Sequence, residues 1–121
     1  MKITRTIIVF DAADIDAVSA FWSGVLGGKV RKDDDWHSVY DADGTPRIGV
    51  QLVPDHVRPQ WPDGEPQQVH LDLYIEDLDA AHEHVMGLGA ELVQAAEDGT
   101  AREGFQVYAD PAGHPFCLCW G

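Results

Sequence analysis

Residues 68–85 read QVHLDLYIEDLDAAHEHV, and this stretch predicts a strand followed directly by a helix. Apolar residues alternate with polar ones over residues 69–75, which is typical of a strand that buries one face. Asp77 can cap a helix over residues 77–88, where Gly87 and Gly89 are stop signals. The stretch holds three histidines, so each could be a metal ligand, a catalytic base or part of the scaffold.

The same strand and helix occur earlier in the chain. The letters DIDA at Asp14 precede DLDA at Asp77 by 63 positions, and Gly24 precedes Gly87 by the same 63. In the first copy we expect a strand at 3–10, a helix at 14–26 and strands at 29–31, 36–40 and 47–53. In the second, strands at 91–94, 105–108 and 115–120 follow the helix. The pattern predicts an α+β fold of two tandem βαβββ modules whose mixed sheets curl around a concave pocket.

Length and composition limit the classes of protein to which this chain can belong. A chain of 121 residues fits a single domain, divided into module one (1–53), a Pro-rich loop (54–66) and module two (67–121). Its formal charge of −13 argues against nucleic acid as a partner and suits a cationic small molecule. No apolar run reaches the roughly 20 residues of a membrane span, and no secretory signal is recognised, so we expect a cytoplasmic protein with free cysteines.

Strand alternation predicts which side chains face the concave pocket. In residues 69–75 the apolar set must lie under the helix, which leaves His70, Asp72 and Tyr74 on the opposite face. By the same reasoning Phe116, Leu118 and Trp120 lie under the helix. Cys117 and Cys119, together with Gly49 and Gln51 in module one, are then expected on the concave side.

Aromatic residues exceed what a helix-covered core requires. Trp36, Tyr74 and Tyr108 are candidate walls of a small-molecule pocket, and Trp61 in the Pro-rich loop is a candidate lid. The alternative, that Trp36 and Trp61 cover sheet edges or a dimer contact, stays open.

Three segments resemble the vicinal oxygen chelate superfamily of glyoxalase I, bleomycin-resistance proteins and extradiol dioxygenases. They are DAADIDAVSAFWSGVLG, VHLDLYIEDLDAAHEHVMGLGAELV and YADPAGHPFCLCW. The resemblance covers nearly the whole chain and implies paired βαβββ modules. It also implies a small-molecule ligand and, as in many relatives, a homodimer.

The resemblance also implies where a metal would bind. Members of glyoxalase type hold it with residues of the first and last strand of each module, here Ile7, Gln51, His70 and Cys117. Only His70 is a usual ligand, because isoleucine cannot coordinate and a glutamine amide coordinates weakly. No metal cofactor is therefore predicted, and a divalent metal on His70 is the alternative.

The other histidines are expected to support the fold or to lie in solvent. His82 and His84 are two residues apart on a helix, about 200° around its axis, so they cannot share a metal. His37, His56 and His114 lie in or beside turn-rich segments and are expected to be solvated.

Two functions follow from the sequence. The first is a metal-free small-molecule-binding protein of the bleomycin-resistance type, whose ligand is cationic or aromatic. Its expected ligand-binding residues are Trp36, Gln51, His70, Asp72, Tyr74, Tyr108 and Cys117. The alternative is a glyoxalase-like lyase, isomerase or dioxygenase in which His70 holds a metal or acts as a base.

Overall fold

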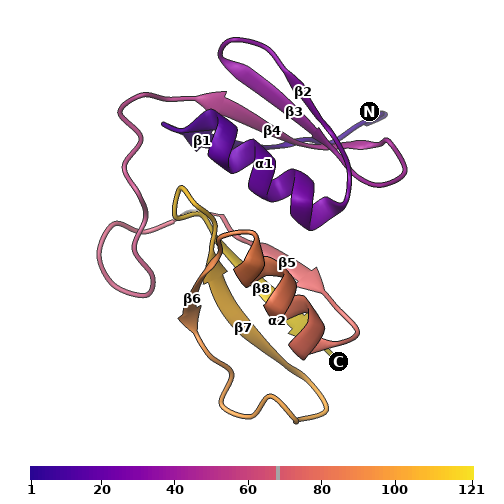
Figure 1. Cartoon of the computed structure of the whole chain (residues 1–121), viewed down its shortest axis with the longest axis vertical. Helices are drawn as coiled ribbons and strands as arrows, with labels where there is room; N and C mark the ends of the chain where they lie inside the picture. Colours follow the sequence, from indigo (N-terminus) through magenta and orange to yellow (C-terminus); the bar gives the residue numbers. More distant parts are fainter. Residues whose placement is uncertain (68) are drawn as a thin grey trace. The chain divides into compact units, whose positions relative to one another are not determined.

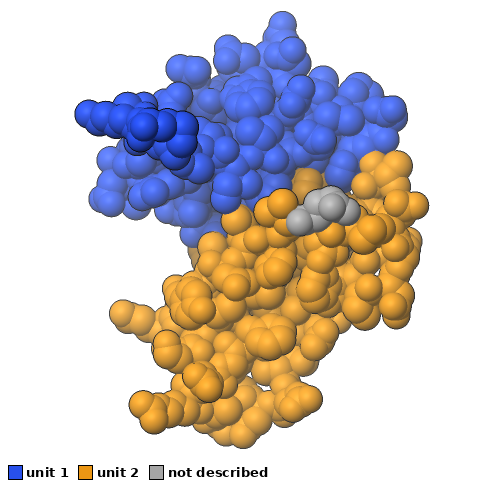
Figure 2. All heavy atoms as spheres, turned by 180° about the vertical axis from the view of Figure 1, so that it is seen from behind, with its two compact units in different colours: residues 1–56 blue, residues 57–121 orange. Residues whose placement is uncertain are grey.

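The computed structural model describes residues 1–67 and 69–121. The chain divides into two compact units, residues 1–56 and residues 57–121, which are coloured separately in Figure 2. The division falls inside the Pro-rich loop, so most of that loop belongs to unit 2. That the two units form one domain stays a prediction.

Unit 1 has the predicted βαβββ order (Figure 1). Its elements are β1 (Ile8–Ala12), α1 (Ile15–Leu26), β2 (Val30–Lys32), β3 (Trp36–Tyr40) and β4 (Pro46–Leu52). The sheet order is β1-β4-β3-β2, with β1 parallel to β4 and the other pairs antiparallel. β1 was predicted at 3–10 but is found later, because its register with β4 begins where Ile8 lies opposite Ile48.

Unit 2 repeats this architecture. Its elements are β5 (Leu71–Tyr74), α2 (Leu78–Gly87), β6 (Glu91–Gln94), β7 (Gly104–Ala109) and β8 (Pro115–Trp120). The sheet order is β5-β8-β7-β6, again with one parallel pair, β5 and β8. The fold is therefore α+β, with two four-stranded mixed sheets that each carry one helix (Figure 1).

The helix ends follow from local side-chain chemistry. Asp14 accepts a hydrogen bond of 3.0 Å from the Ala17 amide, and Asp77 accepts one of 3.0 Å from the Ala80 amide. Each bond satisfies an amide that the first helical turn leaves without a backbone partner. α1 ends at Gly27, whose φ of 72° is the left-handed conformation that glycine adopts without steric cost.

A buried polar pair joins helix to sheet in unit 1. His37 on β3 is only 3% exposed, and its Nδ1 lies 2.8 Å from the Ser19 hydroxyl on α1. The expectation of a solvated His37 was wrong, because this residue lies inside a strand whose alternate residues are buried under α1. The strand itself was predicted at 36–40, so the error lay in which of its side chains are buried.

Unit 2 has a comparable helix-to-sheet pair. His82 on α2 places Nδ1 2.8 Å from the hydroxyl of Tyr108 on β7, to which the Gln106 amide also donates at 2.7 Å. His82 thus supports the fold, as the sequence indicated. His114 is paired as well, with Nδ1 2.7 Å from the buried carboxylate of Asp110, so the expectation of a solvated loop histidine was wrong there too.

In the part of the chain that the structure describes, none of the helices has the length and apolar character needed to span a bilayer.

Candidate functional site

The candidate site is a hollow of about 460 Å³ on the face of the unit 2 sheet. We call it the unit 2 hollow. Its lining residues come from the Pro-rich loop, β5, β7, β8 and their flanks: Trp61, His70, Asp72, Tyr74, Glu103, Gly104, Phe105, Cys117, Cys119 and Trp120. Side chains alternate along β5, where Asp72 and Tyr74 are exposed and Leu71 and Leu73 are half-buried. The predicted concave-facing set of β5 and β8 thus lies together in this hollow.

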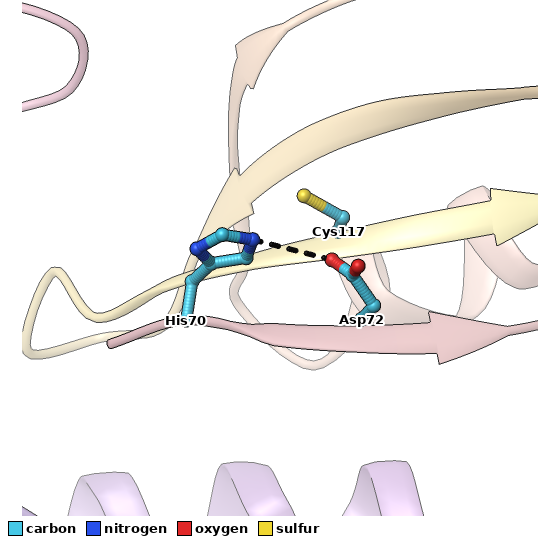
Figure 3. A group of neighbouring side chains, drawn as sticks. All are labelled: His70, Asp72 and Cys117. Atoms are coloured by element: carbon cyan, nitrogen blue, oxygen red, sulfur yellow. Dashed lines mark ion pairs between the residues drawn. The ribbon is translucent and has the colours of Figure 1, made fainter.

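Three polar side chains meet on the sheet at one point of the hollow (Figure 3). His70 and Asp72 project from the same strand segment, and Cys117 projects from β8, directly opposite Asp72 in the parallel register. Nε2 of His70 lies 3.4 Å from Oδ1 of Asp72. One donor atom from each residue lies within 4.8 Å of the others, so a single ligand atom can contact all three.

Burial and the carboxylate of Asp72 together keep the two thiols of the hollow protonated. Burial, and then the hydrogen bond and negative charge of Asp72, raise the pKa of Cys117 to about 12. Burial and the same carboxylate also raise the pKa of Cys119. At neutral pH both groups are therefore thiols, and Cys117 is a poor nucleophile.

This raised pKa predicts alkaline sensitivity. In the unfolded chain Cys117 ionises near its ordinary value of 9.0, but in the folded protein it stays protonated up to about 12. Its contribution to stability is therefore complete below pH 9.0 and is lost as the pH rises toward 12. Urea unfolding across this window should show a free energy of unfolding that falls less steeply in Cys117→Ala than in the wild type. Equal slopes would contradict the assignment.

Aromatic rings form the walls of the hollow. Trp61 packs against the buried cluster of Val107, Cys117 and Cys119, and its ring meets His70 edge-on at a centroid distance of 6.0 Å. Tyr74 and Phe105 are exposed by 75% and 51%, so their ring faces are available to a ligand. These are large exposed apolar groups clustered around carboxylates, which is a feature of binding sites rather than of ordinary surface.

Comparison with known proteins gives the family. A family model described as a glyoxalase-like domain matches residues 7–119. The chain belongs to this family. No curated protein matches the sequence significantly.

Solved structures agree on the fold of this glyoxalase-like chain. The fosfomycin resistance protein FosX from Listeria monocytogenes is 17% identical with a TM-score of 0.74, over 100% of this chain and 93% of that one. FosX from Mesorhizobium loti is 15% identical with a TM-score of 0.71, over 100% and 94%. A glyoxalase/bleomycin resistance protein/dioxygenase family enzyme from Burkholderia phytofirmans is 17% identical with a TM-score of 0.69, over 94% and 95%. At such identities the likeness shows the fold alone.

The structure places three of the expected ligand-binding residues of this glyoxalase-like chain outside the hollow. Tyr108 is fully buried on the other face of the sheet, because it lies opposite Phe116 and shares that residue's helix-covered side. Burial raises the pKa of its hydroxyl. Trp36 and Gln51 belong to unit 1, where they are paired across β3 and β4. Their part in ligand binding stays a prediction.

The strand registers correct the expected metal quartet. Val9 pairs with Gly49, and Asp72, which lies 63 positions after Val9, pairs with Cys117. The counterpart of Cys117 is therefore Gly49, not Gln51, which corresponds instead to Cys119. Unit 1 thus offers no coordinating side chain at either place, because Ile7 and Gly49 both lack one.

Sequence reasoning missed Glu103, Phe105 and Trp120 as lining residues. Phe105 lies opposite Cys119 in the register, so counting alternation along β7 from β8 would have placed it on this face. Trp120 was expected under the helix. It lines the hollow instead, where its indole lies over Gly104, at which a Cβ would come within 2.5 Å of the ring.

The donors His70, Asp72 and Cys117 match a zinc-type ion better than the oxygen-preferring metals. An imidazole nitrogen, a carboxylate oxygen and a thiolate are all common zinc ligands, and three protein ligands with one open position are typical of catalytic zinc. Magnesium, manganese and calcium prefer oxygen, which only Asp72 supplies among these three. Binding would require the Cys117 proton to leave, so it would be favoured by rising pH.

Proposed function

We propose that this glyoxalase-like chain binds a small organic cation in the unit 2 hollow, without a metal. The observation that carries the proposal is the composition of the lining. Four aromatic side chains (Trp61, Tyr74, Phe105 and Trp120) surround two carboxylates (Asp72 and Glu103), and no lysine or arginine is among the described lining residues. Such a lining favours positive charge and apolar bulk in the same ligand.

The physical basis is a combination of two attractions. A cation over an aromatic face gains about 0.5–2 kcal/mol from the ring quadrupole, depending on how well water is excluded. A carboxylate adds a charge-assisted contact, and the net charge of −13 raises the local concentration of cations around the protein.

The polar group at the floor of the hollow supports binding without a metal. Asp72 already accepts a hydrogen bond from the Cys117 thiol and lies beside His70. The Asp72 carboxylate therefore has protein partners without a metal. His70, whose side chain is 41% exposed, remains available for a hydrogen bond to a ligand.

Paired ligands that differ only in charge test the proposal. Choline and the alcohol in which carbon replaces its quaternary nitrogen have nearly the same shape. We expect choline to bind at least about tenfold more tightly than the alcohol, because only the cation is attracted to the ring faces and to the carboxylates. Calorimetric titration of the purified protein measures both affinities. Equal affinities, or a preference for the neutral alcohol, would overturn the cation assignment.

A second candidate function is a metal-dependent glyoxalase-like enzyme, either a lyase, an isomerase or a dioxygenase. The observation that favours it is the mutual reach of His70, Asp72 and Cys117 within 4.8 Å. A bound metal would supply a Lewis acid for an oxygen-bearing substrate. In this candidate His70 either holds the metal or, in a metal-free variant, acts as a base.

Metal analysis separates the two candidates. Protein purified without a histidine tag should be analysed for metals before and after incubation with Fe, Mn, Ni and Zn. Stoichiometric metal that is lost in His70→Ala but retained in His84→Ala, on α2, would favour the enzyme. No metal beyond trace amounts under any of these conditions would favour the binding protein.

Cellular context is part of the proposal. Two free thiols in a ligand-binding hollow suit a reducing compartment, so we place the protein in the cytoplasm. A homodimer is proposed because the family resemblance implies it, and sedimentation equilibrium would show a single mass near 13.3 kDa if it is wrong.

A further inference from the structure

A second hollow of about 390 Å³ lies beside the first in unit 2. Its lining is mixed: Leu92, Val93, Ala109 and Pro115 from β6, β7 and β8 lie beside the ion pair of Arg58 and Glu91, and the Pro-rich loop forms one side. Trp61 lines this hollow as well as the unit 2 hollow. Its indole is therefore a partition between the two.

The partition is held mainly by packing. The Trp61 Nε1 donates to the Gln94 side chain at 3.5 Å, the limit of a hydrogen bond, and the ring lies against the Val107, Cys117 and Cys119 cluster. Breaking one long, exposed hydrogen bond costs little. The indole can therefore be displaced or replaced without leaving a buried polar group unpaired.

The loop that carries Trp61 is anchored at Arg58. Its Nη2 lies 2.7 Å from the Glu91 carboxylate on β6, and its Nη1 donates to the Pro111 carbonyl at 3.0 Å. Gly113 lets the Arg58 side chain approach, since a Cβ there would lie 2.2 Å from Cγ of Arg58. Farther along, the Gln60 amide donates to the Glu65 carbonyl at 2.6 Å, which closes the loop around Trp61.

We infer that Trp61 sets the length of the organic cation that the protein accepts. This inference rests on the proposed function. The cationic head lies among the carboxylates and rings of the unit 2 hollow, and an alkyl tail directed toward β6 meets the indole. With the indole in place the ligand is a short cation. Without it, the apolar part of the second hollow, formed by Val93, Ala109 and Pro115, becomes available to the tail.

The test is a series of alkyltrimethylammonium ions of increasing chain length, each below its micelle-forming concentration, titrated calorimetrically. For the wild type we expect the dissociation constant to stop falling once the tail reaches the indole. For Trp61→Ala we expect it to continue falling, by up to about fourfold for each added methylene, the gain from fully burying one CH₂. The shortest cations should bind Trp61→Ala up to about tenfold more weakly, because one aromatic wall is lost.

Two further variants keep the test specific. Trp61→Phe keeps a smaller ring between the two hollows. Its length profile, the dependence of the dissociation constant on alkyl chain length, should be intermediate between those of the wild type and Trp61→Ala. Arg58→Met releases the anchor and should extend the accepted length, whereas Arg47→Met, which breaks the exposed ion pair with Asp41 in unit 1, should leave the profile unchanged. Cooperative thermal unfolding of each variant shows that it is folded.

The outcomes separate the inference from the function on which it rests. Identical length profiles for wild type and Trp61→Ala would overturn the role of Trp61 while leaving the cation site in place. Absence of binding to every ion in the series, by wild type and variants alike, would overturn the proposed function and this inference with it.

Discussion

Replacing Asp72 by asparagine is expected to weaken choline binding about tenfold, or about 1.4 kcal/mol, while leaving the affinity for the neutral isostere unchanged. Asparagine keeps the size of the side chain and can still accept a hydrogen bond from Cys117. The substitution therefore removes the charge and little else. The Asp72 side chain is 49% exposed, so solvent screening keeps the loss at the lower end of the range for charge-assisted contacts.

Glu97→Gln is the matched control for this experiment. It removes the same charge from an exposed position of unit 2 that does not line the hollow. Calorimetric titration of both variants with choline should show a loss for Asp72→Asn alone. A similar loss in both variants would show that the overall charge, rather than the site, attracts the cation.

Replacing Trp22 by alanine is expected to lower the free energy of unfolding of unit 1 by about 3–5 kcal/mol. Trp22 on α1 is fully buried, stacks on Phe10 of β1 at a centroid distance of 5.2 Å and meets Phe21 edge-on at 5.2 Å. Alanine would leave a large cavity between the helix and the sheet. Because the affected contacts lie within unit 1, hydrogen exchange should accelerate mainly in α1, β1, β3 and β4.

Urea unfolding followed by circular dichroism measures this loss. Ile3→Ala is the control, since Ile3 is 67% exposed and its replacement should change the free energy of unfolding by less than about 0.5 kcal/mol. A change below about 1 kcal/mol in Trp22→Ala would show that this packing does not hold α1 on its sheet.

Local signals allowed most of the fold to be predicted from sequence. The Asp77 cap acts within a few residues and places the start of α2 as predicted, and α1 lies within the helix expected at 14–26. The 63-residue offset between DIDA and DLDA likewise anticipated two βαβββ units. Such features depend on chemistry that the sequence states directly.

The site was predicted in part, because it depends on pairing between strands. Alternation along β5 and β8 placed His70, Asp72 and Cys117 on one face. Tyr108 was proposed only as one of a surplus of aromatic residues. The face on which a β7 residue lies depends on its partner in β8, and that register is a tertiary feature. The same cause led to Gln51 being matched with Cys117.

The Pro-rich loop shows a second limit of structure prediction from the sequence. The sequence indicated a loop near Trp61 but not which groups would hold it. The Arg58 anchor reaches Glu91 and Pro111, which lie 33 and 53 residues away, and no periodic pattern records contacts of this kind.

The most direct test of the cation-binding account is to map choline onto the protein by amide NMR. Resonances of the full chain should be recorded with choline and, separately, with its neutral isostere. The account predicts saturable shifts for choline at residues of β5, β7 and β8 and around Trp61, with much smaller shifts for the isostere at the same concentration. Choline shifts confined to unit 1, or equal shifts for the two ligands, would contradict it.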